Sequence, residues 1–92
     1  MSLDVTRVHT IVNEKGLHAR ASAKLVELVE EFDAEATVSK DGMSVTGDSI
    51  MGLLMLAASR GTTIEVTTSG ADAEALAEAI ETLVASRFGE DM

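Results

Sequence analysis

Apolar side chains recur along the chain with two different periods, and each change of period predicts an element boundary. Residues 5–12 are rich in β-branched types, which favours a strand, and residues 13–16 are turn formers. Over residues 19–32 the apolar positions recur every three or four residues, which is the period of an amphipathic helix. These positions are Ala21, Leu25, Leu28, Val29 and Phe32. A strand, a turn and a helix are therefore predicted in this order.

The middle of the chain predicts a hairpin and a short helix. Two strand-like runs, residues 34–39 and 43–46, flank an Asp-Gly pair, and such a pair between two strands favours a tight hairpin. Ser49 then precedes the apolar run of residues 50–58, and a serine in that place is a typical helix N-cap. We therefore expect two antiparallel strands followed by a helix.

The last third of the chain predicts a strand and a long helix. Residues 62–69 are mostly β-branched, and residues 73–88 carry an apolar stripe at helical spacing. The stripe consists of Leu76, Ala79, Ile80, Leu83 and Val84. The order βαββαβα fits an α+β domain with an open-faced antiparallel sheet and helices on one side. Two known arrangements share the first six elements, one of them the ferredoxin-like split βαβ, so element order alone leaves the fold open.

Composition limits the domain organisation and the partners. A chain of 92 residues suffices for one core, so we expect a single domain over residues 1–92. Hydrophobic residues make up 46% of the chain and aromatic ones 2%, so that core must be aliphatic. The net charge of −9 disfavours binding to nucleic acid. Lys15, Arg20 and Lys24 nevertheless lie near His18, and this local basic spot suits a small anion.

The sequence lacks the patterns of several protein classes. The absence of cysteine excludes disulfide frameworks, thiolate chemistry and cysteine-based zinc sites. There is no run of about 18 apolar residues and no secretory signal pattern, so we expect a soluble cytoplasmic protein without membrane insertion. Phosphate-binding glycine loops, metalloprotease motifs and nucleophile elbows are also absent. We therefore expect no metal, no cofactor and no autonomous enzyme; a carrier that receives and donates a group fits better.

The chain has two histidines, and their positions differ in kind. His9 lies in the middle of the first strand, where an imidazole usually packs within the sheet. His18 follows the turn at Gly16 and precedes the first helical residue, so its side chain lies near backbone N–H groups without partners inside the helix. The helix dipole and Arg20 would keep the imidazole neutral and nucleophilic, and would then stabilise a bound phosphate. From the residues alone, the alternative that His18 merely ends a loop stays open.

A second candidate surface follows the serine cap. One face of the short helix is expected to be buried, namely Leu53, Leu56 and Ala57. The other apolar side chains of the helix point elsewhere: Ile50, Met51 and Leu54. An exposed aliphatic patch of this kind usually docks a partner. The alternative is that the whole helix is buried in the core.

Two motifs at their mutual spacing make the chain resemble a known family. They are Gly16-Leu17-His18-Ala19-Arg20 and Ser49-Ile50-Met51-Gly52, with Gly61-Thr62 before the last strand. Over nearly its whole length the chain resembles HPr, the histidine-containing phosphocarriers of the bacterial phosphotransferase system. The resemblance implies an open-faced β-sandwich, in which three helices cover one face of a four-stranded antiparallel sheet. It also implies that His18 accepts a phosphoryl group on Nδ1 from phosphorylated enzyme I and donates it to an enzyme IIA, with Arg20 beside the phosphate.

The resemblance further implies regulation and docking. Ser49 matches the serine that HPr kinase/phosphorylase phosphorylates in this family, and a phosphate there would place about −2 of charge beside the apolar patch. The expected partner contacts are Leu17, Lys24, Ile50, Met51 and Leu54. For Lys24 an ion pair with Glu27, three residues later, is the competing expectation. We expect a monomer, since a carrier must meet several partners in turn.

Two positions depart from the family pattern, and two other functions stay open. Ala21 stands where the family commonly has proline, and Asp48 places an acid before the regulatory serine. The carrier could serve a nitrogen-related regulatory branch instead of sugar uptake. Alternatively, the chain could be a ferredoxin-like regulatory module that binds a small molecule, in which His18 is incidental.

Overall fold

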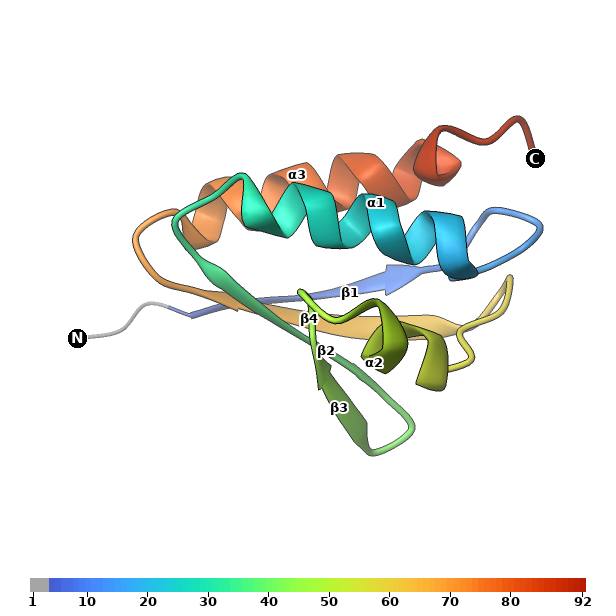
Figure 1. The fold of residues 1–92 in the computed structure, drawn as a ribbon, viewed down its shortest axis with the longest axis horizontal. Helices are drawn as coiled ribbons and strands as arrows, with labels where there is room; N and C mark the ends of the chain where they lie inside the picture. The colour runs from blue at the N-terminus through green and yellow to red at the C-terminus, as the bar shows by residue number, and fades with distance from the viewer. Residues whose placement is uncertain (1–3) are drawn as a thin grey trace.

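The computed structural model describes residues 4–92, and its elements follow the predicted order (Figure 1). The strands are β1 (Val5–Thr10), β2 (Glu35–Lys40), β3 (Met43–Thr46) and β4 (Thr63–Ser69). The helices are α1 (Ala19–Glu30), α2 (Ile50–Met55) and α3 (Ala73–Ala85), followed by a short 3-10 turn, η1 (Arg87–Gly89). Within residues 4–92, no helix has the length and apolar character needed to cross a bilayer.

The four strands form one antiparallel sheet in the order β1-β4-β2-β3. The first and last strands are therefore neighbours. The turn between β2 and β3 has positive φ at Asp41 (50°) and at Gly42 (84°), as a two-residue hairpin loop requires. The three helices cover one face of the sheet, and α1 and α3 run side by side across it (Figure 1). The α+β class and the one-sided cover are as predicted.

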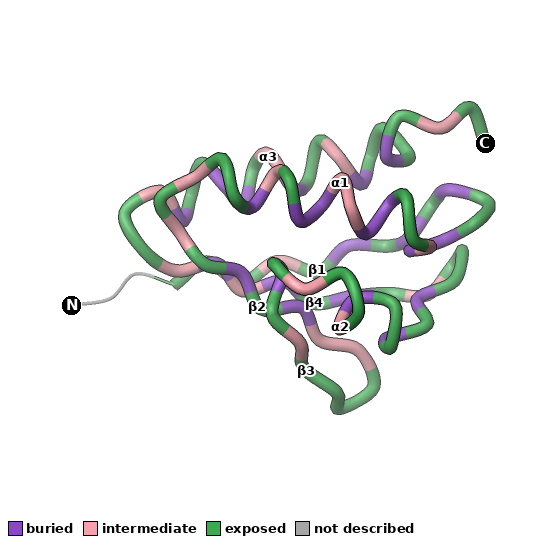
Figure 2. The backbone as a smooth tube through the Cα atoms, in the orientation of Figure 1, coloured by how far each residue is buried: buried purple, intermediate pink, exposed green. Residues whose placement is uncertain are grey.

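The core lies between the sheet and the helices, where Figure 2 shows the buried segments facing one another. Alternate strand residues point inward, so Val38 and Ile64 are buried, whereas Val8 on the opposite face is 64% exposed. Leu25 of α1 and Ile80 of α3 are fully buried in the same cluster. Each such aliphatic side chain stabilises the fold by about 1.5–3 kcal/mol.

Two helices end earlier than their apolar pattern indicates. α1 ends at Glu30, and Phe32, predicted as its last apolar position, is only half-buried beyond that end. α2 ends at Met55. Ala57 then adopts a left-handed φ of 50° and is exposed, whereas Ala58 is buried. The prediction that Ala57 is buried is wrong, because α2 has already ended at Met55 and the left-handed backbone of Ala57 does not continue the helical periodicity.

The third helix also ends early, and this end shapes the site. The apolar pattern predicts a helix to Phe88, but α3 stops at Ala85, and Arg87 and Phe88 have φ values of 59° and 55°. Left-handed backbone is uncommon at residues other than glycine. Here it turns the chain so that Phe88 is fully buried, and burial of the aromatic ring offsets the strain. The residues after Gly89 therefore leave the helix axis.

Candidate functional site

The loop between β1 and α1 is held against the segment that follows α2. Gly16 has a φ of 66°, and a Cβ atom there would lie 2.5 Å from the carbonyl oxygen of Ala58. The backbone N–H of Leu17 donates to this same oxygen over 2.9 Å. The close approach and the positive φ both require glycine at this position. Gly16 thus lets the loop present His18 at the start of α1.

His18 is the N-cap residue of α1, and its imidazole is not used to cap the helix. Its backbone carbonyl accepts the N–H of Ser22 at 2.8 Å, while its side chain makes no capping hydrogen bond. The Ser22 hydroxyl donates to the carbonyl oxygen of Leu17 at 3.2 Å and fixes the first turn from inside. The side chain of His18 is 28% exposed, so the ring is accessible at the surface.

Glu90, far away in the sequence, contacts the His18 ring. Its Oε2 atom is hydrogen-bonded to His18 Nε2. Its Oε1 atom accepts a hydrogen bond of 2.9 Å from Nδ2 of Asn13, which also donates to the carbonyl oxygen of Gly16 at 2.8 Å. Asn13 is fully buried, so it holds Glu90 from below the surface. Together these contacts join the loop after β1 to the segment after α3.

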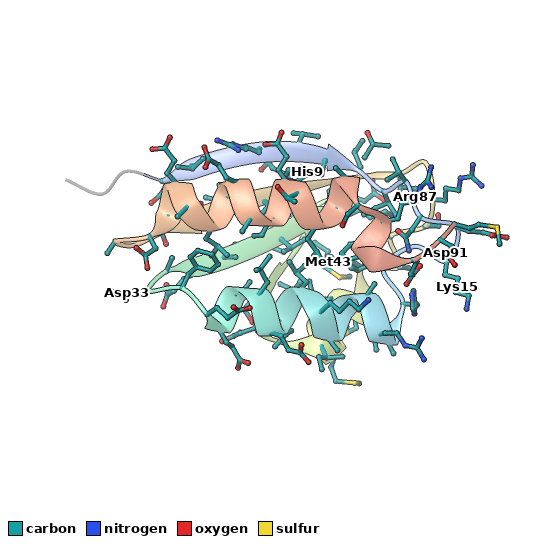
Figure 3. All side chains as sticks on the ribbon, turned by 90° about the horizontal axis from the view of Figure 1, so that it is seen from above. His9, Lys15, Asp33, Met43, Arg87 and Asp91 are labelled. Carbon is teal, nitrogen blue, oxygen red and sulfur yellow. The ribbon has the colours of Figure 1, made fainter. Side chains whose placement is uncertain are left out.

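The C-terminal segment is anchored at three further places. Phe88 is buried in the core, and its carbonyl oxygen accepts a hydrogen bond of 2.5 Å from Nζ of Lys24. The backbone N–H of Glu14 donates to the carbonyl oxygen of Met92 at 3.0 Å. Figure 3 accordingly shows Lys15 and Asp91 side by side at one end of the molecule.

The surroundings of Glu90 favour its charged form. Burial raises the pKa of this carboxyl, but the hydrogen bonds from Asn13 and His18, together with the charges of His18 and Lys15, outweigh burial and lower the pKa below its usual value. Glu90 is therefore ionised at neutral pH. An ionised carboxylate only accepts hydrogen bonds, so its hydrogen bond with the imidazole requires a proton on Nε2.

A hollow of about 440 Å³ opens beside the imidazole. Its lining consists of Glu14, Lys15, His18, Ala19, Arg20, Glu90, Asp91 and Met92. Arg20 is exposed, and it and Lys15 bring positive charge to the hollow next to the start of α1. The structure thus brings together His18 and Arg20, as the sequence predicts. His9, by contrast, is buried in the sheet, in line with its expected packing role.

The apolar patch on α2 is exposed as predicted, and it lies close to His18. Met51 is 70% exposed, and Ile50 and Leu54 are also exposed. Leu54 and His18 line the same shallow hollow. Ser49 caps α2, because its hydroxyl accepts the N–H of Gly52 at 3.0 Å. The alternative of a wholly buried helix is therefore wrong. Met55, which sequence analysis did not include, is exposed as well.

Leu17 and Lys24, both expected to contact partners, make contacts within the fold instead. Leu17 is only 4% exposed and belongs to the core, so its side chain offers little surface to a partner. Lys24 forms its hydrogen bond with Phe88 and, among residues 4–92, no ion pair with Glu27. The expected Lys24–Glu27 pair is wrong, because the turn after α3 brings a backbone carbonyl within reach of the ammonium group.

A family model described as "PTS HPr component phosphorylation site" matches residues 5–86. The chain belongs to the HPr family. The phosphocarrier protein HPr of Cupriavidus necator is 47% identical over 81 residues, which cover 88% of this chain and 91% of that protein. The phosphocarrier protein NPr of Shewanella violacea is 46% identical over 81 residues, which cover 88% of this chain and 89% of that protein.

Solved structures of HPr agree with the fold of this family member. An HPr of Thermoanaerobacter tengcongensis superposes with a TM-score of 0.91 and 34% identity, covering 96% of this chain and 99% of that one. An HPr dimer of the same organism matches with a TM-score of 0.75 and 36% identity, covering 89% of this chain and 94% of that one. The open-faced HPr sandwich is therefore the fold, and the ferredoxin-like alternative is wrong. The protein is an HPr/NPr phosphocarrier of the phosphotransferase system.

Sequence analysis did not single out Asn13 or Glu90. Asn13 resembles an ordinary turn residue, and Glu90 is one of many acids near the C-terminus. Gly89 was an available signal, because glycine commonly follows the end of a helix and would have separated Phe88 from α3. Nothing local indicates that Glu90 meets a histidine 72 positions earlier.

Proposed function

We propose that this HPr family member accepts a phosphoryl group on Nδ1 of His18 and passes it on. The observation that carries this proposal is the position of His18: an accessible imidazole at the start of α1, beside a hollow that Arg20 and Lys15 also line. The first backbone N–H groups of a helix have no partners within it and favour an anion. Arg20 adds a guanidinium that can donate to the phosphate oxygens.

The partners in this proposal are phosphorylated enzyme I as donor and an enzyme IIA as acceptor. Both would dock on the α2 patch, formed by Ile50, Met51 and Leu54, because this exposed apolar surface borders His18. One patch serving both partners is compatible with a carrier that meets them in turn. A monomer remains our prediction for the free carrier.

Ser49 is the proposed regulatory site, with HPr kinase/phosphorylase as the partner. Its hydroxyl already occupies the N-cap of α2, and a phosphate there would add about −2 of charge next to Ile50. This charge would oppose docking on an apolar surface. Asp48 precedes Ser49 and is exposed, so the kinase would have to accept an acid at that place.

The relatives include both an HPr and an NPr at nearly equal identity, 47% and 46%. Both sugar uptake and a nitrogen-related branch are therefore compatible with the resemblance. The enzyme IIA that takes the phosphoryl group from this chain distinguishes the two branches.

The direct test is phosphorylation of the purified protein with phosphoenolpyruvate and enzyme I. We expect one acid-labile phosphate on the wild type and on His9→Gln, which is the control for the second histidine. We expect none on His18→Ala. An acid-labile phosphate on His18→Ala would overturn the assignment.

A further inference from the structure

We propose that Glu90 is a positioning residue for His18: its carboxylate holds the imidazole proton on Nε2 and so leaves the lone pair of Nδ1 free for the phosphoryl group. This inference rests on the proposed function, in which His18 is the phosphoryl acceptor. It adds a role for the C-terminal segment, which neither of the two sequence motifs contains.

The geometry singles out one ring nitrogen. Glu90 Oε2 is hydrogen-bonded to Nε2, whereas Nδ1 has no hydrogen-bond partner among residues 4–92. A neutral imidazole carries its proton on one nitrogen only, and the partner of that nitrogen selects which one. The contact with Glu90 therefore selects the form in which Nδ1 carries a lone pair.

Glu90 is itself held in place at both oxygens. Oε1 accepts from the buried amide of Asn13, while Oε2 meets the imidazole, so the plane of the carboxylate is set from two sides. The backbone on the N-terminal side of Glu90 is anchored by burial of Phe88 and by the hydrogen bond from Lys24. A carboxylate can orient a histidine only if its own position is fixed. The contacts that hold Glu90 are therefore part of how it positions His18.

Groups of both charge signs surround the contact between His18 and Glu90. The loop after β1 contributes Glu14 and Lys15, α1 contributes Arg20, and the C-terminal segment contributes Asp91. Burial raises the pKa of the Glu90 carboxyl, but the hydrogen bonds from Asn13 and His18 and the charges of His18 and Lys15 outweigh burial, so the lowered pKa keeps the group an acceptor at neutral pH. Asp91 lines the same hollow but has no bond to the imidazole in the structure of residues 4–92, which makes it a matched control for the position of the ring proton.

The transfer step is balanced without any proton movement. The lone pair of Nδ1 forms the bond to phosphorus while the bond between phosphorus and the donor breaks, and its electron pair leaves with the donor. The proton stays on Nε2, and the positive charge that the ring acquires faces the Glu90 carboxylate. With the proton on Nδ1 instead, the ring would have to lose it before it could accept the phosphoryl group.

The first experiment reads the proton position directly, by nitrogen-15 NMR of the His18 ring in the unphosphorylated protein above pH 7.5. We expect the wild type and Asp91→Asn to carry the proton on Nε2. In Glu90→Gln the charged acceptor is lost, so we expect the ring to shift toward a mixture of the two tautomers. This readout needs neither enzyme I nor phosphate.

The second experiment measures phosphoryl transfer from enzyme I as a function of carrier concentration. We expect Glu90→Gln to lower kcat roughly 10- to 100-fold, a loss of the size found when the hydrogen-bond partner of a metal-binding histidine is removed. KM should stay unchanged, because Glu90 does not belong to the α2 patch. Glu74→Gln, at an exposed acid of α3 outside the hollow, should leave both parameters at the wild-type values.

The outcomes separate this inference from the proposed function. A phosphate on His18→Ala overturns the proposed function. If instead the phosphate depends on His18 but Glu90→Gln retains both the Nε2 proton and the wild-type kcat, the role of Glu90 is refuted while that of His18 stands. A fall in kcat without a change of tautomer also refutes the positioning role.

Discussion

Lys24, one turn into α1, donates a hydrogen bond from Nζ to the backbone carbonyl oxygen of Phe88, 2.5 Å away in the turn after α3. The two residues are 64 positions apart in the sequence. Their contact, together with burial of the Phe88 ring, keeps the C-terminal segment beside the loop that carries His18. Lys24, a residue expected to contact partners, thus helps to hold the C-terminal segment next to His18.

Removal of the Phe88 ring should both destabilise the fold and release the segment that follows it. We expect Phe88→Ala to lower the free energy of unfolding by about 3–5 kcal/mol, since the ring is fully buried. Phe88→Leu retains most of the buried volume and should lose less. Urea denaturation measures both. Met92→Ala, at a residue 70% exposed, is the control, and a loss in Phe88→Ala no greater than in this control would contradict the packing role.

Substitutions at Ser49 should separate its cap from its charge. Ser49→Ala removes the acceptor for the N–H of Gly52 and should cost about 1 kcal/mol of stability. Ser49→Asp keeps an acceptor at the N-cap, so its stability should stay near that of the wild type. Its negative charge lies next to the α2 patch, and we therefore expect slower phosphoryl transfer from enzyme I than in Ser49→Ala. Equal transfer rates in the two variants would rule out regulation by charge at the docking surface.

The buried histidine of β1 should make stability depend on pH. Burial lowers the pKa of His9 below 6.5, a nearby Glu81 raises it in part, and Arg7 lowers it further. As the pH falls below about 6.5, the unfolded chain binds a proton at His9 that the folded chain does not bind. The free energy of unfolding therefore falls with pH until the pH reaches the folded-state pKa of His9. Above about pH 7.5 the effect should be absent.

The measurement is the free energy of unfolding from pH 5 to pH 8 in the wild type and in His9→Gln. We expect the variant to lose less stability than the wild type as the solution is acidified, because it has no proton to take up at this position. Parallel curves would show that protonation of His9 is not penalised in the folded protein.

Local sequence pattern predicted much of the fold and the general location of the site. The three- to four-residue spacing of apolar positions located α1 and most of α3. The turn at Gly16 and the serine cap before Ile50 located the starts of α1 and α2. These features depend on hydrogen bonds and side-chain contacts within one turn or one hairpin, so neighbouring residues suffice to specify them.

The helix ends were less predictable. Ala57 and Phe88 both lie where an apolar pattern continues beyond the helix, and periodicity alone extends the helix through them. In the folded chain a left-handed residue stops each helix, and at Phe88 the burial of the ring in the shared core outweighs local preference. Whether this burial is available depends on the sheet and on α1, not on residues near Phe88.

The sequence by itself determined which elements form, that a histidine stands at the start of α1, and that apolar side chains of α2 are left over for the surface. Only the tertiary structure decided what the His18 ring touches. Asn13 and Glu90 meet because α3 crosses the sheet beside α1 and the turn at Phe88 directs the chain back to the loop after β1 (Figure 1). Contacts over more than 70 residues arise from packing of whole elements, and no local pattern encodes them.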